Sequence, residues 1–328
     1  MEDKKVSIIT PCFNGEGFAE RFFNNILGQT YQNIELIFVN DGSSDRTEAI
    51  AKSYIPTFEQ SGRKLIYIYQ ENSGQAEAMN KGLAIFSGDY LMWTDSDDIL
   101  DKDNIRKKVE FLEQNPDCGY VMCYAQEVHE SDLTKKIGDL RRIQPHGEDN
   151  IFEDVILEKN IVYTPGVYMA RTEAILGAIP SRHIMKSDVG QNWQMLMPLT
   201  YKYKCGYIKE VLFSYVIRED SHSRREKKLE DVIEKLHKQN DLIACVLKEM
   251  GLENSKYMDM LKDKVVRKEF DNGYFFKDKQ LMKQKYKELK DMGRCTRRDT
   301  LILWSGLCPV IDVLYSIFKM AKRAYRRR

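Results

Sequence analysis

The sequence predicts an α/β fold in which a mostly parallel sheet with flanking helices is followed by a C-terminal helical extension. Two observations predict it. Over the first 125 residues, short apolar runs alternate with helical patterns, which is typical of a sheet wound with right-handed crossovers. From 224 to 292 the composition turns to Lys, Glu, Leu and Met at helical spacing, without proline, which indicates two or three helices.

The elements expected in the first part of the chain follow one another in strict order. Strands are expected at 6–10, 34–39, 65–69 and 90–93, and helices at 17–27, 44–54 and 74–86. Ligands of such sheets bind beyond the carboxyl ends of the strands. The residues to inspect for function are therefore those directly after each strand, at 11–14, 40–45, 71–74 and 94–98.

The rest of the chain divides by pattern. Three further short strands are expected at 119–123, 167–170 and 211–215. A length of 328 residues has room for one large domain with an appendage, or for two domains. We predict a domain over 1–223, with halves of about 1–125 and 126–223, then a helical extension over 224–292 and a basic tail over 293–328.

Composition excludes several classes of protein. A hydrophobic fraction of 42% and a charged fraction of 31% exclude global disorder. With 51 basic and 50 acidic residues the net charge is +1, which gives no reason to expect nucleic acid as a partner. The seven cysteines are scattered without zinc-site spacing, and no secretory signal follows Met1, so we expect free thiols in a reducing cytoplasm.

An acidic cluster, Asp95-Ser-Asp97-Asp98, directly follows an apolar strand. Three carboxylates in four residues repel one another unless something positive lies beside them. Hard oxygen ligands of this kind suit Mg²⁺ or Mn²⁺, which in turn would hold a phosphate. The alternative is a solvated acidic loop that caps the next helix.

The other three strand ends carry weaker signals. Asp41 lies in Asn-Asp-Gly-Ser-Ser-Asp, where it would accept a hydrogen bond from a base or a ribose, or would simply belong to a turn. Phe13, in Pro11-Cys-Phe-Asn14, would stack on a ring or lie buried in the core. Gly74 lies in a glycine turn that enters a helix.

Together these segments resemble the family 2 glycosyltransferases, which are inverting sugar transferases of GT-A fold that use nucleotide-diphospho-sugars. The resemblance covers about residues 5–125 strongly and continues weakly to about 223. It is carried by the segments 6–14, 34–45 and 88–98, whose order and spacing agree with the family. It implies that 1–125 binds the nucleotide and 126–223 the acceptor.

The resemblance also implies roles for individual residues. Pro11 and Phe13 would flank the nucleobase, with Asn14 and Gly74 beside the donor, and Asp41 would bind the base, most often uracil. Asp95 and Asp97 would form the Asp-x-Asp motif that binds the ribose and, through Mg²⁺ or Mn²⁺, the diphosphate. The cation would neutralise the departing nucleoside diphosphate. Met79 stands where the family often has arginine.

The catalytic base is a departure from the family. An inverting transferase needs a carboxylate that takes the proton from the acceptor hydroxyl. The family usually supplies it from a Glu-Asp pair at the start of a helix, where this sequence has Gln191-Asn192. Asp188, four residues before Asn192, is the expected substitute; alternatively it caps that helix.

The segment Arg218-Glu-Asp-Ser-His222-Ser resembles the part of the family that closes over the diphosphate. It implies that Arg218 clamps a phosphate and that His222 joins the cation. The alternative for His222 is an exposed loop position without a metal.

The tail combines an apolar run with basic residues. Residues 301–318 form an apolar run that holds one charge, Asp312, and is interrupted by Pro309, and residues 291–328 carry a net charge of +6 from nine basic and three acidic side chains. We expect a helix that lies in the interface of an anionic membrane, at the inner face of the plasma membrane, rather than one that spans it. Docking of 301–328 on the protein's own helices is the alternative.

The function expected from these observations is transfer of a sugar, with inversion, from a nucleotide-diphospho-sugar to a growing glycan or lipid-linked glycan of a bacterial surface polysaccharide. A non-catalytic relative that binds nucleotide-sugars or acts as a scaffold is the main alternative, motivated by Gln191-Asn192 and Met79. A nucleotidyltransferase would want a basic, glycine-rich phosphate loop after the first strand, and 11–17 has no basic residue.

Overall fold

A computed structural model describes residues 4–143, 151–218, 228–308, 310–311 and 313. By its contacts the chain divides into two compact units, Met1–His222 and Ser223–Arg328, and each is described here by itself.

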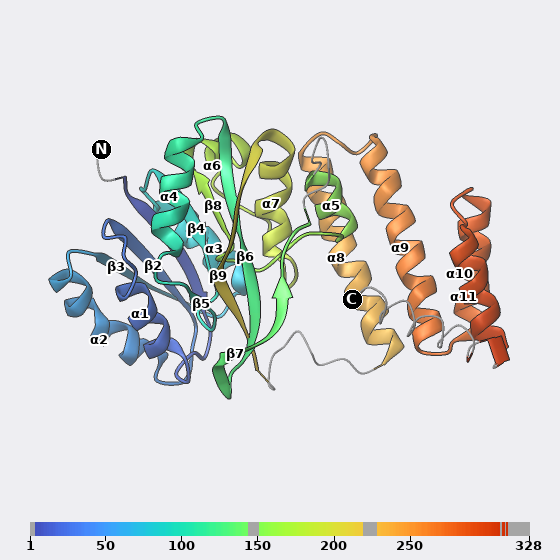
Figure 1. The fold of residues 1–328 in the computed structure, drawn as a ribbon, viewed down its shortest axis with the longest axis horizontal. Helices are drawn as coiled ribbons and strands as arrows, with labels where there is room; N and C mark the ends of the chain where they lie inside the picture. Colours follow the sequence, from blue (N-terminus) through green and yellow to red (C-terminus); the bar gives the residue numbers. More distant parts are fainter. Residues whose placement is uncertain (1–3, 144–150, 219–227, 309, 312, 314–328) are drawn as a thin grey trace. The chain divides into compact units, whose positions relative to one another are not determined.

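The first unit is built on a nine-stranded sheet with the order β3-β2-β1-β4-β8-β6-β9-β5, and β7 pairs with β6 outside this path (Figure 1). The strands β3, β2, β1 and β4 run parallel, which confirms the mostly parallel α/β fold predicted from the sequence. The strands are β1 (Val6–Cys12), β2 (Ile34–Asp41), β3 (Lys64–Gln70), β4 (Tyr90–Trp93), β5 (Ile99–Leu100), β6 (Cys118–His129), β7 (Asp132–Leu140), β8 (Tyr168–Arg171) and β9 (Lys204–Ile217).

Helices cover both faces of the parallel strands. On one face the ring of Phe23, from α1, lies 4.9 Å from that of Phe38, from β2. On the opposite face Gly82 of α3 lies against Ile9 of β1, so closely that an added Cβ would come within 2.4 Å of the isoleucine side chain. The helices of this unit are α1 (Ala19–Leu27), α2 (Thr47–Gln60), α3 (Gln75–Ile85), α4 (Asn104–Gln114), α5 (Ile151–Leu157), α6 (Thr172–Ala178) and α7 (Gln191–Lys202).

The register of the parallel strands brings their carboxyl ends to one edge. Cys12 of β1 lies opposite Asn40 of β2, and Asp41 lies opposite Gln70 of β3. On the other side of β1, Ile9 lies opposite Trp93, the last residue of β4. The residues that follow these strands are therefore neighbours in space, as the sequence predicts.

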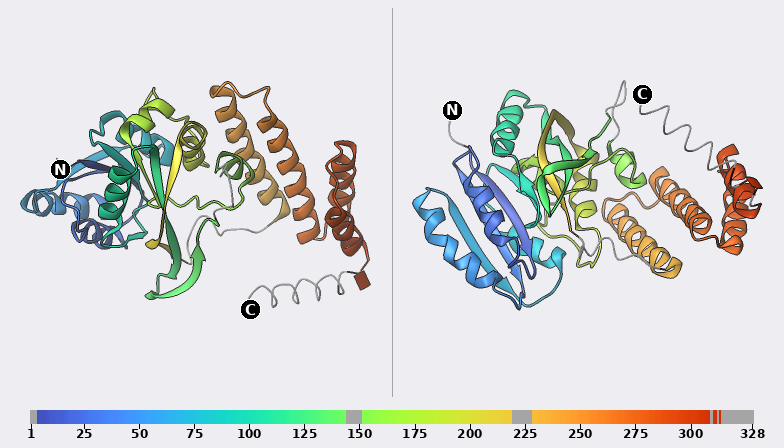
Figure 2. Two further views of the ribbon diagram at one scale, coloured as in Figure 1. Left: turned by 45° about the horizontal axis from the view of Figure 1, so that its top comes forward. Right: turned by 60° about the horizontal axis from the view of Figure 1, so that its bottom comes forward.

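The second half of the unit is more regular than its sequence pattern suggests. The strand expected at 119–123 lies in the first half of β6, and the one expected at 211–215 lies in the second half of β9; both strands are long, and they pair in parallel. The hairpin of β6 and β7 was not expected. Figure 2 shows the two long strands side by side in both views.

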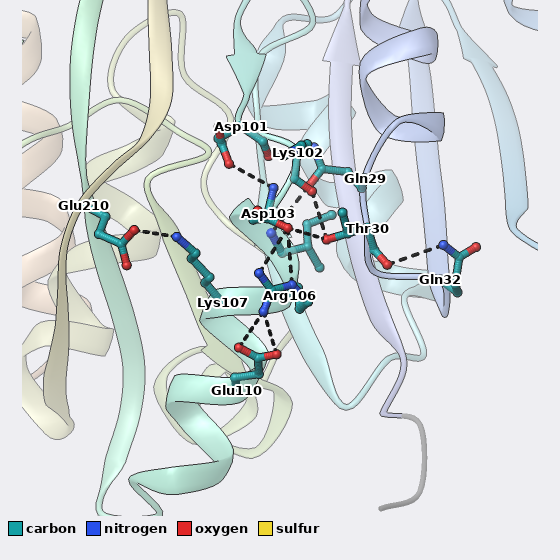
Figure 3. A network of polar contacts seen from close by, with 11 residues as sticks. Gln29, Thr30, Gln32, Asp101, Lys102, Asp103, Arg106, Lys107, Glu110 and Glu210 are labelled. Carbon is teal, nitrogen blue, oxygen red and sulfur yellow. Dashed lines mark hydrogen bonds and ion pairs between the residues drawn. The ribbon is translucent and has the colours of Figure 1, made fainter.

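A polar network fixes the chain after the acidic cluster (Figure 3). The side chain of Gln29, after α1, donates a hydrogen bond of 2.9 Å to the backbone carbonyl of Asp101. The hydroxyl of Thr30 donates one of 2.8 Å to the carboxylate of Asp103, which also lies 3.1 Å from Arg106 of α4. Lys107, on the same helix, pairs with Glu210 of β9. These contacts anchor the start of α4 to the connection between α1 and β2, and its first turn to β9.

The second unit consists of α8 (Leu229–Glu249), α9 (Lys256–Phe275), α10 (Lys279–Asp291) and α11 (Arg297–Leu307). Its core is a cluster of apolar side chains from α9, α10 and α11, namely Val266, Phe270, Met282, Leu289 and Ile302. Helix α11 begins with a capping box, in which the Thr296 hydroxyl and the Asp299 carboxylate satisfy each other's backbone N–H groups.

Helix α11 also leaves large apolar side chains exposed. Leu301 is 55% exposed and Trp304 57%, and beyond the helix Val310 and Val313 are 69% and 60% exposed. Within the described residues no helix is long and apolar enough to cross a membrane. Most of the predicted interfacial helix, including residues 314–328, lies outside the described residues.

Candidate active site

The loops after β1 and β2 are tied together. Asn14 has a positive φ of 50°, and its side-chain oxygen accepts a hydrogen bond of 2.9 Å from the backbone N–H of Ser44. The Asn14 N–H in turn donates to the hydroxyl of Ser43. Pro11 is buried, whereas the ring of Phe13 is 46% exposed, so the alternative of a core phenylalanine is wrong. Phe13 thus presents an accessible ring at the edge of the sheet.

Asp41 is nearly buried, with 5% of its surface exposed, and holds the turn between β3 and α3. One carboxylate oxygen accepts hydrogen bonds from the side chain of Gln70 at 2.6 Å and from the N–H of Ser73 at 2.8 Å. The other accepts one from the N–H of Gly74 at 3.0 Å. Gly74 has a φ of 91°, a conformation that favours glycine. The structure thus brings Asp41 and Gly74 into direct contact.

Asp95 lies at the start of the acidic cluster and is bound by a residue that the sequence analysis did not single out. The side-chain amide of Gln75, the first residue of α3, donates a hydrogen bond of 2.7 Å to the Asp95 carboxylate. Burial, and then the charge of Asp97, raise the pKa of Asp95 to about 7. A cationic partner at this position would restore the ionised form.

Asp97 already lies beside a cation. Its carboxylate is 3.4 Å from the guanidinium of Arg218, at the end of β9, and its side chain is 35% exposed. The Asp97 backbone carbonyl accepts a hydrogen bond of 2.6 Å from Arg21 of α1, another residue that the sequence analysis did not single out. The structure therefore brings Asp97 and Arg218 together, although 120 residues separate them in sequence.

Asp98 differs from the other two acids because it is buried, with 2% of its surface exposed. One of its oxygens accepts a hydrogen bond of 2.8 Å from the N–H of Val216 in β9. Burial, followed by the charges of Asp97 and Asp95, raises its pKa well above the usual range. Asp98 therefore anchors the acidic loop to β9, and Asp95 and Asp97 are the members that face the site.

Asn192, at the position where the family usually has its catalytic acid, uses both ends of its amide inside the protein. Its oxygen accepts a hydrogen bond of 3.0 Å from the indole N–H of Trp93, the last residue of β4. Its NH₂ group donates one of 3.0 Å to the backbone carbonyl of Tyr163. The amide thus joins α7 to β4 and to the segment before β8.

Asp188 is exposed and lies in the loop that leads into α7. That helix has Gly190 as its N-cap, without a side-chain cap, so Asp188 does not cap it in this way. The start of the loop is anchored to α3 through two hydrogen bonds between Asn80 and the backbone of Ile184, at 2.8 and 2.9 Å. A Cβ added to Gly74 would lie 3.9 Å from the carbonyl of Ser187, so the loop reaches the turn that Asp41 holds.

A cavity of about 470 Å³ opens beside Arg218. Its walls come from the loop between β1 and α1, from the turn of the β6–β7 hairpin and from Arg218 itself; they are Asn14, Gly17, Phe18, His129, Glu130, Ser131 and Arg218. Two predicted site residues, Asn14 and Arg218, therefore line one hollow. His222 lies outside the described residues, and the described ranges contain no group of three or more His, Cys, Asp or Glu side chains arranged for a metal.

The amide of Asn192 supports a stability prediction. In Asn192→Asp a carboxylate oxygen would face the carbonyl of Tyr163, where the amide now donates, and we expect a loss of about 1–3 kcal/mol in unfolding free energy. The positive end of the α7 dipole would offset about 0.3–1 kcal/mol of that loss. Urea denaturation followed by circular dichroism measures it.

Gln191→Glu is the matched control, since it adds the same charge one residue earlier on the helix and should leave stability within about 0.5 kcal/mol. Equal stability of Asn192→Asp and the unaltered protein would contradict the prediction.

The model of the family described as glycosyl transferase family 2 matches residues 7–185, which is more than half of the chain. The chain belongs to this family. The matched range of the family 2 domain contains the four strand ends, the acidic cluster and the start of the loop that carries Asp188.

Relatives of the family 2 domain match its first part. An uncharacterized glycosyltransferase of Rickettsia typhi is 40% identical over 121 residues, which cover 35% of this chain and 36% of the relative. Glycosyltransferase GlyA of Streptococcus pneumoniae is 37% identical over 115 residues, which cover 34% of this chain and 16% of GlyA. The chain thus spans about a third or less of the length of these two curated relatives.

Solved structures share the fold at low sequence identity. S. aureus TarS 1–349 in complex with UDP-GlcNAc is 15% identical, with a TM-score of 0.55 and coverage of 98% of this chain and 92% of that one. The mannosyltransferase PcManGT of Pyrobaculum calidifontis, in complex with GDP-Man and Mn²⁺, is also 15% identical, with a TM-score of 0.55 and coverage of 95% and 83%. These likenesses support the GT-A fold of the family 2 domain followed by C-terminal helices.

Proposed function

We propose that this chain transfers a sugar, with inversion, from a nucleotide-diphospho-sugar to a glycan or lipid-linked glycan acceptor of a bacterial surface polysaccharide. One observation carries the proposal: in a chain of glycosyl transferase family 2, Asp41, Asp95 and Asp97 gather at the carboxyl edge of the parallel strands. Residues 1–125 would bind the donor, and 126–223 would complete the site on the acceptor side.

The donor would lie along this edge. Phe13 offers an exposed ring for the nucleobase, with Pro11 behind it, and Asp41 lies at the turn that carries Gly74. The Asp41 oxygens already accept hydrogen bonds from the protein, so its orientation is fixed before a base or ribose arrives. Uracil is our first choice of base. TarS was solved with UDP-GlcNAc and PcManGT with GDP-Man, so both nucleotides belong in a screen.

The residues present fit a divalent cation. Asp97 offers a hard carboxylate that is 35% exposed and already has a cationic group, Arg218, beside it. Mg²⁺ is usually held by one or two carboxylates together with the substrate's phosphates, so a preformed cage of three protein ligands is not required. When bound, Mg²⁺ or Mn²⁺ would neutralise the charge of the departing nucleoside diphosphate. His222 remains a proposed further ligand.

The remaining steps fall to this chain's own residues. Asp188, on the exposed loop beside Gly74, is the proposed base that takes the proton from the acceptor hydroxyl. Asn192 is excluded from that task because an amide is not basic and both ends of this one are hydrogen-bonded. Arg218 would bind a phosphate of the donor.

The test is a thermal-shift screen of nucleotide-sugars, with and without Mn²⁺, followed by a transfer assay with glycan acceptors. A true donor stabilises the folded protein by mass action, by about 2.7 kcal/mol at a hundredfold excess over its Kd.

The occupied amide of Asn192 also favours a second candidate function, that of a relative that binds nucleotide-sugars without turning them over. Stabilisation with no turnover under any acceptor would favour that candidate, and no stabilisation at all would overturn both.

We further propose that residues 301–328 contact an anionic membrane at the inner face of the plasma membrane. The supporting observation is the exposure of Leu301 and Trp304 on α11, in a sequence that continues as a mainly apolar stretch to Phe318 and then turns basic. Trp304 suits the depth of a membrane interface, and basic residues near an anionic surface contribute about 1 kcal/mol each.

Deletion of 301–328 should therefore abolish sedimentation with vesicles that contain phosphatidylserine, and high salt should release part of the intact protein because charges are screened. Vesicles of neutral phosphatidylcholine are the control. Retention of all protein after salt and carbonate washes would indicate a spanning helix. Absence of binding to the anionic vesicles would indicate that the segment docks on its own unit.

A further inference from the structure

The ion pair between Arg218 and Asp97 carries an inference about how the donor site assembles. The guanidinium nitrogen Nη1 lies 3.4 Å from the Asp97 oxygen Oδ2, and the Arg218 side chain is only 16% exposed. The guanidinium carbon also lies 4.7 Å from the centre of the Phe18 ring. Arg218 is thus held in a defined position beside an acid of the Asp-x-Asp motif.

A divalent cation and this guanidinium compete for the same carboxylate. Mg²⁺ requires a carboxylate oxygen at about 2.0–2.1 Å in near-octahedral geometry. A guanidinium at 3.4 Å from the same oxygen occupies the space of the cation's other ligands, and its positive charge repels the ion. The cation therefore binds Asp97 only after Arg218 has moved.

The surroundings allow the arginine to move while the acid stays in place. The Asp97 backbone is fixed independently by Arg21, which donates to its carbonyl at 2.6 Å. Arg218 also borders the cavity of about 470 Å³ that is lined by Asn14, Phe18 and the hairpin turn, so there is room beside it. A diphosphate offers a guanidinium two parallel charge-assisted hydrogen bonds, which is a stronger partner than a single long contact with a carboxylate.

We propose that in the donor-free protein Arg218 occupies the place beside Asp97 that a divalent cation would take, and that the diphosphate of the donor draws Arg218 away. The divalent cation then binds together with the donor rather than before it. The proposal rests on the proposed function, because it needs a diphosphate donor. Linkage requires the effect to be reciprocal: the nucleotide tightens cation binding by the same factor by which the cation tightens nucleotide binding.

The experiment measures Mn²⁺ binding to the full-length protein by electron paramagnetic resonance, alone and with saturating UDP or GDP. In the unaltered protein we expect Mn²⁺ alone to bind weakly and the nucleotide to tighten it by about 5- to 150-fold. In Arg218→Gln, Mn²⁺ alone should bind at least about fivefold more tightly, and the tightening by the nucleotide should be smaller than in the unaltered protein by about the same factor, because only coordination by its phosphates remains. Arg218→Lys keeps the charge and should keep the weak binding of Mn²⁺ alone.

Arg141→Gln is the matched control. Arg141 lies over the ring of Tyr124 at 5.6 Å and pairs with Asp139 at 2.7 Å, so it combines the same two contacts on the hairpin edge. It should leave both Mn²⁺ affinities unchanged.

Three results would overturn the inference. The first is an unchanged or weaker affinity for Mn²⁺ alone in Arg218→Gln, and the second is an unchanged effect of the nucleotide in that variant. The third is an affinity for Mn²⁺ alone that rises as much in Arg218→Lys as in Arg218→Gln. In each case the proposed function would stand if the unaltered protein binds nucleotide with Mn²⁺. If the unaltered protein binds neither UDP nor GDP in the presence of Mn²⁺, the proposed function fails and the inference fails with it.

Discussion

Asp97→Asn is expected to reduce kcat by about 10²- to 10⁴-fold, because under the proposed function a divalent cation held by this carboxylate would stabilise the charge developing on the departing diphosphate by several kcal/mol. The change removes one charge and keeps the size of the side chain. Its effect on folding should be small, since the Asp97 side chain is 35% exposed and the contact with Arg21 uses the backbone carbonyl. Initial rates of sugar transfer with Mn²⁺, compared with thermal unfolding of the same samples, separate the two effects.

Asp117→Asn is the control for this prediction. Asp117 is 60% exposed and pairs with the equally exposed Lys204, so its loss should change neither kcat nor stability by a measurable amount. Full activity of Asp97→Asn, or full activity of the unaltered enzyme in excess EDTA, would remove the metal from the mechanism.

The second large effect is expected for Asp188→Asn, which should lower kcat by about 10²- to 10⁴-fold if this carboxylate takes the acceptor proton. Donor affinity should not change, because Asp188 is exposed and has been assigned no contact with the nucleotide. Initial rates of sugar transfer and donor affinity, measured for Asp188→Asn and the unaltered enzyme, check this prediction.

Ser187→Ala tests whether the loop itself, rather than its carboxylate, is responsible. It removes the hydroxyl that accepts from Val189 at 3.1 Å and donates to the carbonyl of the same residue at 2.7 Å, yet leaves Asp188 in place. An unchanged kcat in Asp188→Asn, or an equal loss of kcat in both variants, would remove Asp188 as the base and leave that role to another acid.

The edge formed by the carboxyl ends of β1 to β4 was largely predictable because it depends on local sequence pattern. Each parallel strand is visible in the sequence as an apolar run, and the carboxyl ends of parallel strands lie at the same edge of the sheet. For this reason Phe13, Asp41 and Asp95 could be placed at one edge from sequence alone. Local pattern does not reveal that Asp41 holds the turn at Gly74, because that contact depends on the register between β2 and β3.

The second half of the first unit was less predictable because its contacts join segments that are distant in sequence. The β6–β7 hairpin escaped notice since β7 is mostly exposed and its sequence is rich in charges, so it lacks the alternating apolar pattern of a half-buried strand. One sequence feature could have pointed to Gln75 as a site residue: it is the first residue of a helix that follows a strand end. The pairing of Arg218 with Asp97 had only a family resemblance to suggest that both lie near the phosphates.

The acidic loop is bounded by strands that are made at very different times during synthesis. It follows β4, the last of the four parallel strands to be synthesised, which ends at Trp93. It leads into β5, which pairs with β9, and its Asp98 is hydrogen-bonded to Val216 of β9. At about 5–20 residues per second, the ribosome needs on the order of 6–23 s to pass from one partner to the other. The four parallel strands can therefore form on the nascent chain well before the loop acquires its final geometry. A chain that stops short of β9 would therefore retain the edge formed by β1 to β4 but lack Val216 and Arg218, the partners of Asp98 and Asp97.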